Sequence, residues 1–282
     1  MVNFNGNLIQ NTETSMGPYN RGLHYGDAVF ETLRVSGSKI FFWEDHYFRL
    51  MASMRILRME IPVNFTLEFL EKEVLNLVET FSEKNSSYNI KILVWRKAGG
   101  KYSPKSNDIE YLLTGAQIET LFYTLHDKRY EVELFKDHFV NSGILSTLKT
   151  NNKIVQVLGS IFAKENDYQN CLLLNETKTI VEALNGNLFL VKGSIIKTPP
   201  LTDGCLNGIL RKQIIAICLQ LPEYTLEEAS VSPFELQKAD EMFVTNVISG
   251  IQPISKYRKK EYSNTVAKNL LTKLNVRARL TS

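Results

Sequence analysis

The chain has 282 residues, of which 44% are hydrophobic and 22% charged, the composition of a globular protein rather than of a disordered or collagen-like one. Lys and Arg number 33 against 30 Asp and Glu, and the resulting net charge of +3 argues against electrostatic binding of nucleic acid. No apolar run reaches the roughly 18 residues of a transmembrane helix, and the N-terminal residues do not resemble a secretory signal. We therefore expect a cytoplasmic protein of enzyme size that associates with neither nucleic acid nor membrane.

The first 120 or so residues combine short strand patterns with two amphipathic helix patterns. Asn5-Gly6 stands between apolar residues and is typical of a hairpin turn. Thr66 precedes the second helical pattern and is a suitable N-cap. We expect strands at 30–35, 39–43, 88–95 and 109–113, and helices at 44–60 and 66–81.

The rest of the chain predicts a second unit with the elements in another order. Ser232-Pro233 opens a helix, with the serine as cap and the proline in the first turn. Other helical patterns cover 151–163, 208–219 and 262–277, and strand patterns cover 171–174, 179–181, 187–191 and 242–248. The least patterned stretch is 115–124, so we expect domains at 1–117 and 125–282 joined by a linker at 118–124. The predicted class is α/β, of the α+β type, with two domains.

Several common chemistries are absent from the sequence. It contains no P-loop, C-x-x-C, H-E-x-x-H or G-x-S-x-G motif. The four histidines have no metal-ligand spacing, and the three cysteines are too scattered for a disulfide framework. We expect no metal site.

Two segments carry ionisable groups where packing alone does not require them. Residues 20–32 place two glycines among charged groups at the start of a strand, which fits either close approach to a ligand or an ordinary loop. Lys149 ends an apolar stretch. Burial there would lower the pKa of the lysine and let its neutral amine attack a carbonyl, whereas in solvent it would be an ordinary cation.

Two later segments raise similar alternatives. Glu182 stands between two apolar strand halves, so it either needs a buried partner, such as a side chain or a protonated cofactor ring, or faces water at a turn. Residues 198–211 lead a loop with two prolines and two glycines into a helix. The first-turn amides of that helix are suited to hold a phosphate, and Gly208 would let the backbone come close, although many such helices bind nothing.

The four segments occur in an order that resembles a known family. Behind Lys149 come E-x-x-x-x-N-L-F from Glu182, T-P-P from Thr198 and G-I-x-R from Gly208. This series is similar to that of the class IV aminotransferases, the fold-type-IV pyridoxal phosphate (PLP) enzymes. They include branched-chain and D-amino-acid aminotransferases and aminodeoxychorismate lyases. The resemblance implies a two-domain fold like that of D-amino-acid aminotransferase, with PLP in the interdomain cleft.

The resemblance also implies roles for individual residues. Lys149 matches the catalytic lysine that forms the Schiff base with PLP and then moves the Cα proton. Glu182 matches the carboxylate that pairs with the pyridine nitrogen and so improves the electron sink. Arg49 matches the phosphate-binding arginine, whose fork suits phosphate. Other positions similar to the cofactor side are Asn152, Asn187, Gly208, Ile209, Leu210 and Asn246, and those similar to the substrate side are Tyr25, Phe30, Arg96, Lys101 and Tyr102.

The sequence departs from both branches of the family. Leu210 and Val247 stand where branched-chain enzymes carry phosphate-binding threonines, and Ile154 replaces their tyrosine. Asn152 and the stretch around Asn246 resemble the lyases, whereas Glu31 is more typical of aminotransferases.

These departures leave three functions open. The phosphate-side residues favour an aminodeoxychorismate lyase, which forms 4-aminobenzoate and pyruvate. A branched-chain or D-amino-acid aminotransferase is the alternative, and the missing threonines allow a catalytically silent homologue that binds a metabolite. Because the family is usually dimeric, we expect a homodimer that acts on a small amino-acid-like substrate.

Overall fold

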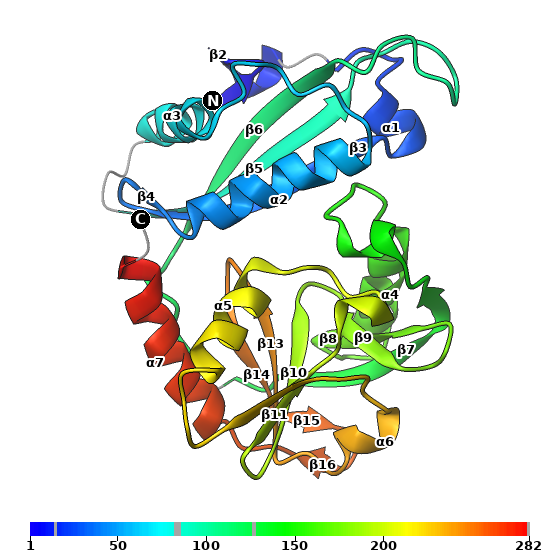
Figure 1. Ribbon diagram of the computed structural model, residues 1–282, viewed down its shortest axis with the longest axis vertical. Helices are drawn as coiled ribbons and strands as arrows, with labels where there is room; N and C mark the ends of the chain where they lie inside the picture. The colour runs from blue at the N-terminus through cyan, green and yellow to red at the C-terminus, as the bar shows by residue number, and fades with distance from the viewer. Residues whose placement is uncertain (14–15, 82–85, 126–127, 281–282) are drawn as a thin grey trace. The chain divides into compact units, whose positions relative to one another are not determined.

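The computed structural model describes residues 1–13, 16–81, 86–125 and 128–280 (Figure 1). By their internal contacts these residues form two units. The first comprises Met1–Phe122 together with the short segment Lys149–Asn152, and the second comprises Tyr123–Leu148 and Lys153–Leu280. The segment that carries Lys149 therefore packs with the start of the chain.

The first unit is built on a six-stranded antiparallel sheet in the order β2-β1-β6-β5-β3-β4. Its strands are β1 (Val2–Phe4), β2 (Asn7–Ile9), β3 (Ala28–Ser36), β4 (Lys39–Ile40), β5 (Ser87–Arg96) and β6 (Ile109–Ile118). Its helices are η1 (Asn11–Glu13), α1 (Arg21–Tyr25), α2 (Trp43–Ile56) and α3 (Leu67–Glu79). The Asn5-Gly6 hairpin turn is confirmed, with φ of 50° and 87° at the two residues.

Most of the expected elements of this unit are confirmed. Thr66 caps α3 by accepting a hydrogen bond from the amide of Phe69. The strand expected at 39–43 ends at Ile40, because Phe42 adopts a left-handed conformation and α2 begins at the next residue. β6 continues to Ile118, into the stretch where the sequence showed no strand pattern.

The alternation of side chains gives the sheet of the first unit two different faces. One face carries the core against α2 and α3; its members include Val29, Leu33, Ile90, Ile92, Leu113, Leu50, Met54, Leu70 and Leu77. Each such burial contributes about 1.5–3 kcal/mol. Because successive side chains of a strand alternate, Phe30 and Thr32 of β3 lie on the opposite face. Both are only half-buried.

The second unit contains two five-stranded sheets, β12-β11-β10-β13-β14 and β16-β15-β7-β8-β9, which bury a shared apolar core. The strands are β7 (Glu131–Val140), β8 (Asn170–Asn175), β9 (Ile180–Ala183), β10 (Asn187–Lys192), β11 (Ile195–Thr198), β12 (Thr225–Glu228), β13 (Glu241–Asn246), β14 (Gly250–Ile254), β15 (Lys256–Tyr257) and β16 (Lys260–Glu261). The helices are η2 (Ile144–Thr147), α4 (Ile154–Glu165), η3 (Leu201–Asp203), α5 (Ile209–Cys218), α6 (Pro233–Leu236) and α7 (Thr265–Leu280).

The second unit follows the sequence pattern in part, and the strands β11, β12 and β14 were not expected. Ser232 caps α6, as its position before Pro233 predicted, and the structure adds a full capping box with Glu235, but α6 is a single turn. β7 was not expected, because charged residues interrupt its alternation. The α/β class of the α+β type is confirmed. No helix in the described ranges has the length and apolar character needed to cross a lipid bilayer.

Candidate active site

Lys149 is anchored to the start of β3 by backbone pairing. The amide of Phe30 donates to the Lys149 carbonyl at 2.9 Å, and the amide of Asn151 donates to the Ala28 carbonyl at 3.0 Å. Val29 and Thr150 form an antiparallel bridge between these two bonds. The Nζ atom of Lys149 lies 4.5 Å from the centre of the Phe30 ring. The expected catalytic lysine is thus brought beside an expected substrate-side residue, and both side chains are half-buried.

A buried carboxylate on the helix-covered face of the same sheet holds Arg49. Glu31 Oε1 and Oε2 accept from Nε and Nη2 of Arg49 at 2.8 and 2.6 Å, a bidentate pair. Glu31 Oε2 also accepts from Nδ1 of His46 at 2.7 Å. The side chains of Glu31 and His46 are almost inaccessible, at 2% and 0% exposed. The expected phosphate-binding arginine is therefore fixed in one orientation.

The local sequence explains this network. Glu31 alternates with Val29 and Leu33 on β3, so its side chain points towards α2. His46 and Arg49 are three residues apart on α2 and lie on the same side of the helix. His46 was not among the predicted site residues. Its i, i+3 spacing to Arg49 could have indicated that both side chains face the same group.

Burial and charge act in opposite directions on these groups. Burial alone would raise the pKa of Glu31, but the charge of Arg49 and the hydrogen bonds from His46 and Arg49 outweigh it and lower the pKa to about 2. Burial lowers the pKa of His46, and the contact with Glu31 only partly offsets this. His46 is therefore the neutral tautomer that donates from Nδ1. Its buried Nε2 has no hydrogen-bond partner within the described ranges.

Glu31→Gln should lower the free energy of unfolding by about 3 kcal/mol, because it leaves the Arg49 charge buried without its carboxylate. Urea unfolding at neutral pH measures this change, and Glu119→Gln, at an exposed position, is the matched control. An equal effect of both substitutions would contradict the role of the pair.

The same pair predicts how acid affects stability. Since the folded pKa of Glu31, about 2, lies below its ordinary value, the stabilisation is complete above about pH 4.5 and is lost as the pH falls towards 2. The stability difference between wild type and Glu31→Gln should therefore shrink over that interval. A difference that stays constant with pH would mean that Glu31 is not ionised in the folded state.

The other expected site residues in the first unit, three on the substrate side and Asn152 on the cofactor side, have different surroundings. Tyr25 and Tyr102 form a tilted aromatic pair with ring centres 5.8 Å apart, and both are exposed. Lys101 is exposed, and its carbonyl accepts from Nη1 of Arg21 at 2.6 Å. Asn152 donates to the carbonyl of Gly26 at 3.2 Å. The structure thus brings Tyr25 and Tyr102 together.

Arg96 is enclosed by protein groups. Its Nε donates to Asp27 at 3.0 Å, and its Nη1 donates to the Asn107 side chain at 2.5 Å and the Arg58 carbonyl at 3.0 Å. Nη2 donates to the Leu57 carbonyl at 2.6 Å. In this geometry the guanidinium ties three segments of the first unit together.

In the second unit, the side chains of Glu182 and Asn187 bind the backbone amide and the backbone carbonyl of Leu206. The amide of Leu206 donates to Glu182 Oε2 at 2.9 Å, and Asn187 Nδ2 donates to the Leu206 carbonyl at 2.8 Å. Glu182 is 8% exposed and Asn187 is 3% exposed. Of the two alternatives for Glu182, the structure confirms the buried carboxylate with a partner and not the turn residue in water.

The clamp on Leu206 sets the start of α5. Gly208 is the N-cap, and a Cβ there would lie 1.9 Å from Asn187 Oδ1, so only glycine fits. Within the described ranges, no acceptor pairs with the amides of Ile209, Leu210 and Arg211. These amides lie at the positive end of the helix dipole, the arrangement that binds anions.

The end of β13 carries two polar side chains, Thr245 and Asn246, of which Asn246 was expected on the cofactor side. Thr245 is opposite Asn187 in the strand register, and its buried Oγ1 has no hydrogen-bond partner among the described residues. The sequence analysis missed this threonine, which lies two positions before the expected one. Asn246 Oδ1 accepts from the amides of Ile248 and Ser249 at 3.1 and 2.9 Å, so this oxygen shapes the following turn.

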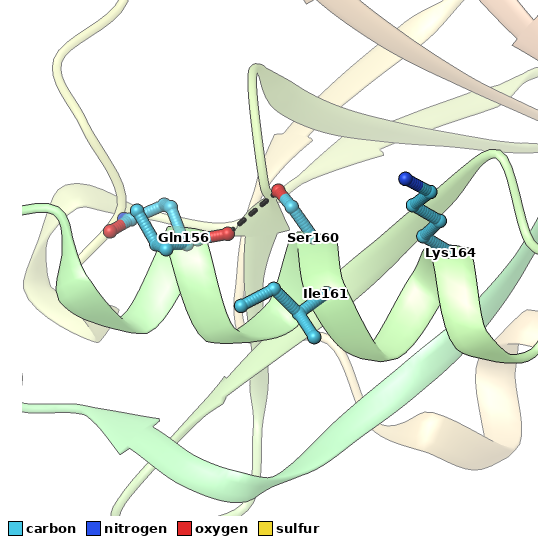
Figure 2. Close-up of a pocket in the computed structure, with 5 residues that line it drawn as sticks. Gln156, Ser160, Ile161 and Lys164 are labelled. Carbon is cyan, nitrogen blue, oxygen red and sulfur yellow. Dashed lines mark hydrogen bonds between the residues drawn. The ribbon is translucent and has the colours of Figure 1, made fainter.

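A separate open hollow of about 390 Å³ lies along α4 (Figure 2). Gln156, Val157, Ser160, Ile161 and Lys164 line it. Ser160 Oγ donates to the Gln156 carbonyl at 2.7 Å, which is the dashed line in Figure 2. The lining includes none of the residues expected at the active site.

Comparisons with known proteins agree with this chemistry. The family model of class IV amino-transferases matches residues 28–257. An aminodeoxychorismate lyase of Vibrio harveyi is 25% identical over 251 residues, 88% of this chain and 89% of that protein. A D-alanine aminotransferase of Listeria monocytogenes serotype 4b is 26% identical over 270 residues, 89% of this chain and 85% of that protein.

The fold is also that of solved structures. The branched-chain aminotransferase of Thermoproteus uzoniensis, crystallised with norvaline, matches with a TM-score of 0.87 at 22% identity, over 99% of this chain and 94% of that one. This confirms the expected fold-type-IV architecture. Enzymes of class IV use pyridoxal phosphate. Since the family model covers most of the chain, the protein belongs to the class IV aminotransferase family of pyridoxal phosphate enzymes.

Proposed function

We propose that this enzyme is an aminodeoxychorismate lyase that forms 4-aminobenzoate and pyruvate. Lys149 is its catalytic residue, and it removes the proton from the carbon that bears the substrate's amino group. The observation that supports Lys149 as the catalytic residue is the backbone pairing of its segment with β3. In this arrangement Nζ of Lys149 lies 4.5 Å from the centre of the Phe30 ring. That anchoring fixes a nucleophile where a flexible surface lysine would move freely.

The residues present fit pyridoxal phosphate. Glu31 orients the Arg49 guanidinium, whose fork suits a phosphate, and the amides at the start of α5 form an anion-binding helix end. Gly208 lets the start of α5 lie close to Asn187, since a Cβ there would be 1.9 Å from Asn187 Oδ1. Glu182 is a buried carboxylate that accepts from the amide of Leu206, and its negative charge would suit a protonated ring nitrogen. When bound, the cofactor supplies an aldehyde for the amine and a ring that accepts electrons.

The chain's own groups then divide the work. Lys149 Nζ takes the proton from the carbon that bears the substrate's amino group. The same amine later donates this proton as a general acid. The apolar ring of Phe30 limits water around this amine. Glu182 and Asn187 keep the Leu206 backbone in place and so orient the amides of α5.

The choice of the lyase rests on the phosphate-side residues and on similarity. Leu210 and Val247 depart from the branched-chain pattern, and Asn152 and Asn246 match the lyase pattern. The lyase of Vibrio harveyi supports the same choice at 25% identity. The second candidate is a branched-chain or D-amino-acid aminotransferase, which Glu31 and the Listeria relative favour. A homodimer and a cytoplasmic location remain predictions from the sequence.

One experiment separates these functions. The purified protein is loaded with PLP and incubated in parallel with aminodeoxychorismate, with leucine plus 2-oxoglutarate, and with D-alanine plus 2-oxoglutarate. Formation of 4-aminobenzoate supports the lyase, whereas a new keto acid in either other reaction supports an aminotransferase. A protein that takes up no PLP and forms no product would be the catalytically silent homologue.

A further inference from the structure

We propose that Arg21 is a positioning residue, which holds the loop between β5 and β6, residues 97–108, in one conformation before substrate binds. The sequence analysis assigned no role to Arg21. The inference rests on the proposed function only in taking two residues of this loop, Lys101 and Tyr102, as substrate-side residues. It adds that the substrate meets a loop whose shape is already fixed by the protein.

Arg21 lies beside the end of β5, where the loop begins. It is the first residue of α1, and Asn20 caps this short helix by accepting from the amide of Leu23. A Cβ on Gly22 would be 3.3 Å from the Cβ of Trp95, so the helix lies close against the strand. Arg21 is only 4% exposed. Its guanidinium is therefore directed at protein groups and not at solvent.

The Arg21 guanidinium binds two backbone carbonyls of the loop. Nη1 donates to the carbonyl of Lys101 at 2.6 Å and to the carbonyl of Gly99 at 3.2 Å. Hydrogen bonds from a charged donor are stronger than those between neutral groups. Because the two carbonyls are two residues apart, this one donor fixes the turn at Gly100 between them.

The loop has features that make such bonds necessary. Gly99 and Gly100 have φ of 121° and 76°, and glycine loses more backbone freedom on ordering than any other residue. The side chains of Lys101 and Tyr102 are exposed, so neither is packed into the core. The shape of the loop tip therefore depends on hydrogen bonds to its backbone, and those from Arg21 are the charge-assisted ones.

Arg21 is itself held by an ion-pair network. Asp27 Oδ2 accepts from Nε of Arg21 at 2.9 Å and from Nε of Arg96 at 3.0 Å. Arg96 donates in turn to the carbonyls of Leu57 and Arg58, which follow α2. The loop tip is thus connected through two buried guanidinium groups to the end of α2.

Arg21 also contacts the expected substrate-side aromatic residues. Its guanidinium carbon lies 4.9 Å from the centre of the Tyr25 ring, a favourable cation–π distance. The Tyr25 ring is 5.8 Å from that of Tyr102. One side chain therefore contacts the backbone of Lys101 and the ring of Tyr25, and Tyr25 contacts Tyr102.

The first test measures the shape of the loop by limited trypsin cleavage of the PLP-loaded protein. We expect Arg21→Gln to raise the rate of cleavage after Lys101 at least about tenfold, because the loop opens more often when its charged donor is lost. Cleavage after Lys178, in an exposed turn of the second unit, is the internal reference. The matched control is Arg55→Gln, an exposed arginine at the end of α2.

The second test measures what the loop does for the substrate. For whichever substrate named above is turned over, Arg21→Gln should raise KM at least about fivefold and leave kcat within about twofold. When Lys101→Ala and Tyr102→Ala are already present, Arg21→Gln should change KM by less than about twofold, because a residue that acts through others adds nothing once they are gone.

Thermal melts show whether the variants fold. If Arg21→Gln does not, Arg21→Lys carries the same tests, because it keeps the positive charge beside Asp27 and loses the fork that reaches both carbonyls.

The outcomes are distinct. Unchanged cleavage after Lys101, or an equal change in Arg55→Gln, overturns the positioning role. So does faster cleavage with an unchanged KM, or an Arg21→Gln effect that persists in full without Lys101 and Tyr102. Failure of the proposed function is seen separately, as the absence of a borohydride-reduced pyridoxyl group on Lys149, whatever the rate of cleavage is.

Discussion

Replacing Lys149 with alanine should reduce turnover of any accepted substrate by a factor of at least about 10³ while the fold remains. In the proposed function this amine is both the nucleophile and the proton carrier, and positioned acid–base groups alone contribute about 10²–10⁴ to the rate. The two hydrogen bonds that anchor the segment involve only backbone atoms, so they survive the substitution. Steady-state rates on the substrates named above, together with thermal melts, measure the two parts of this prediction.

Lys149→Ala also has a chemical readout. The wild type should absorb in the near-visible when loaded with PLP, and borohydride should fix a pyridoxyl group on Lys149 that mass spectrometry of peptides locates. Lys164→Ala, on the exposed side of α4, is the control and should behave as wild type. A label on another lysine, or near-wild-type turnover of Lys149→Ala, would remove this residue from the mechanism.

Glu182→Gln should slow proton removal by about 10²–10³, the usual cost of losing one electrostatic partner of the reacting system. The side-chain oxygen of glutamine can still accept from the amide of Leu206, so the start of α5 should keep its geometry. What is lost is the negative charge, which in the proposed function would keep the ring nitrogen protonated and the ring a strong electron sink.

The measurement for Glu182→Gln separates binding from chemistry. We expect kcat to fall, with a PLP affinity within a few-fold of wild type and an unchanged melting temperature. The control is Glu227→Gln, an exposed glutamate on β12. An unchanged kcat would mean that the ring nitrogen pairs with another group, and a large loss of PLP affinity would mean that the clamp on Leu206 needs the charge.

Local patterns in the sequence determined the elements and the type of chemistry. The turn signal at Asn5-Gly6 and the cap signals at Thr66 and Ser232 predicted the local structure correctly, because the groups involved lie within a few residues of one another. Glu182 was identified as unusual because a carboxylate inside an apolar strand must find a partner. The order of the motifs was sufficient for the family.

Other features required the tertiary structure, because they join residues far apart in the chain. The pairing of Lys149 with β3 and the Glu31–His46–Arg49 network both depend on which segments pack together. Sequence periodicity tells which residues share a face of one strand or helix, but not which other element covers that face.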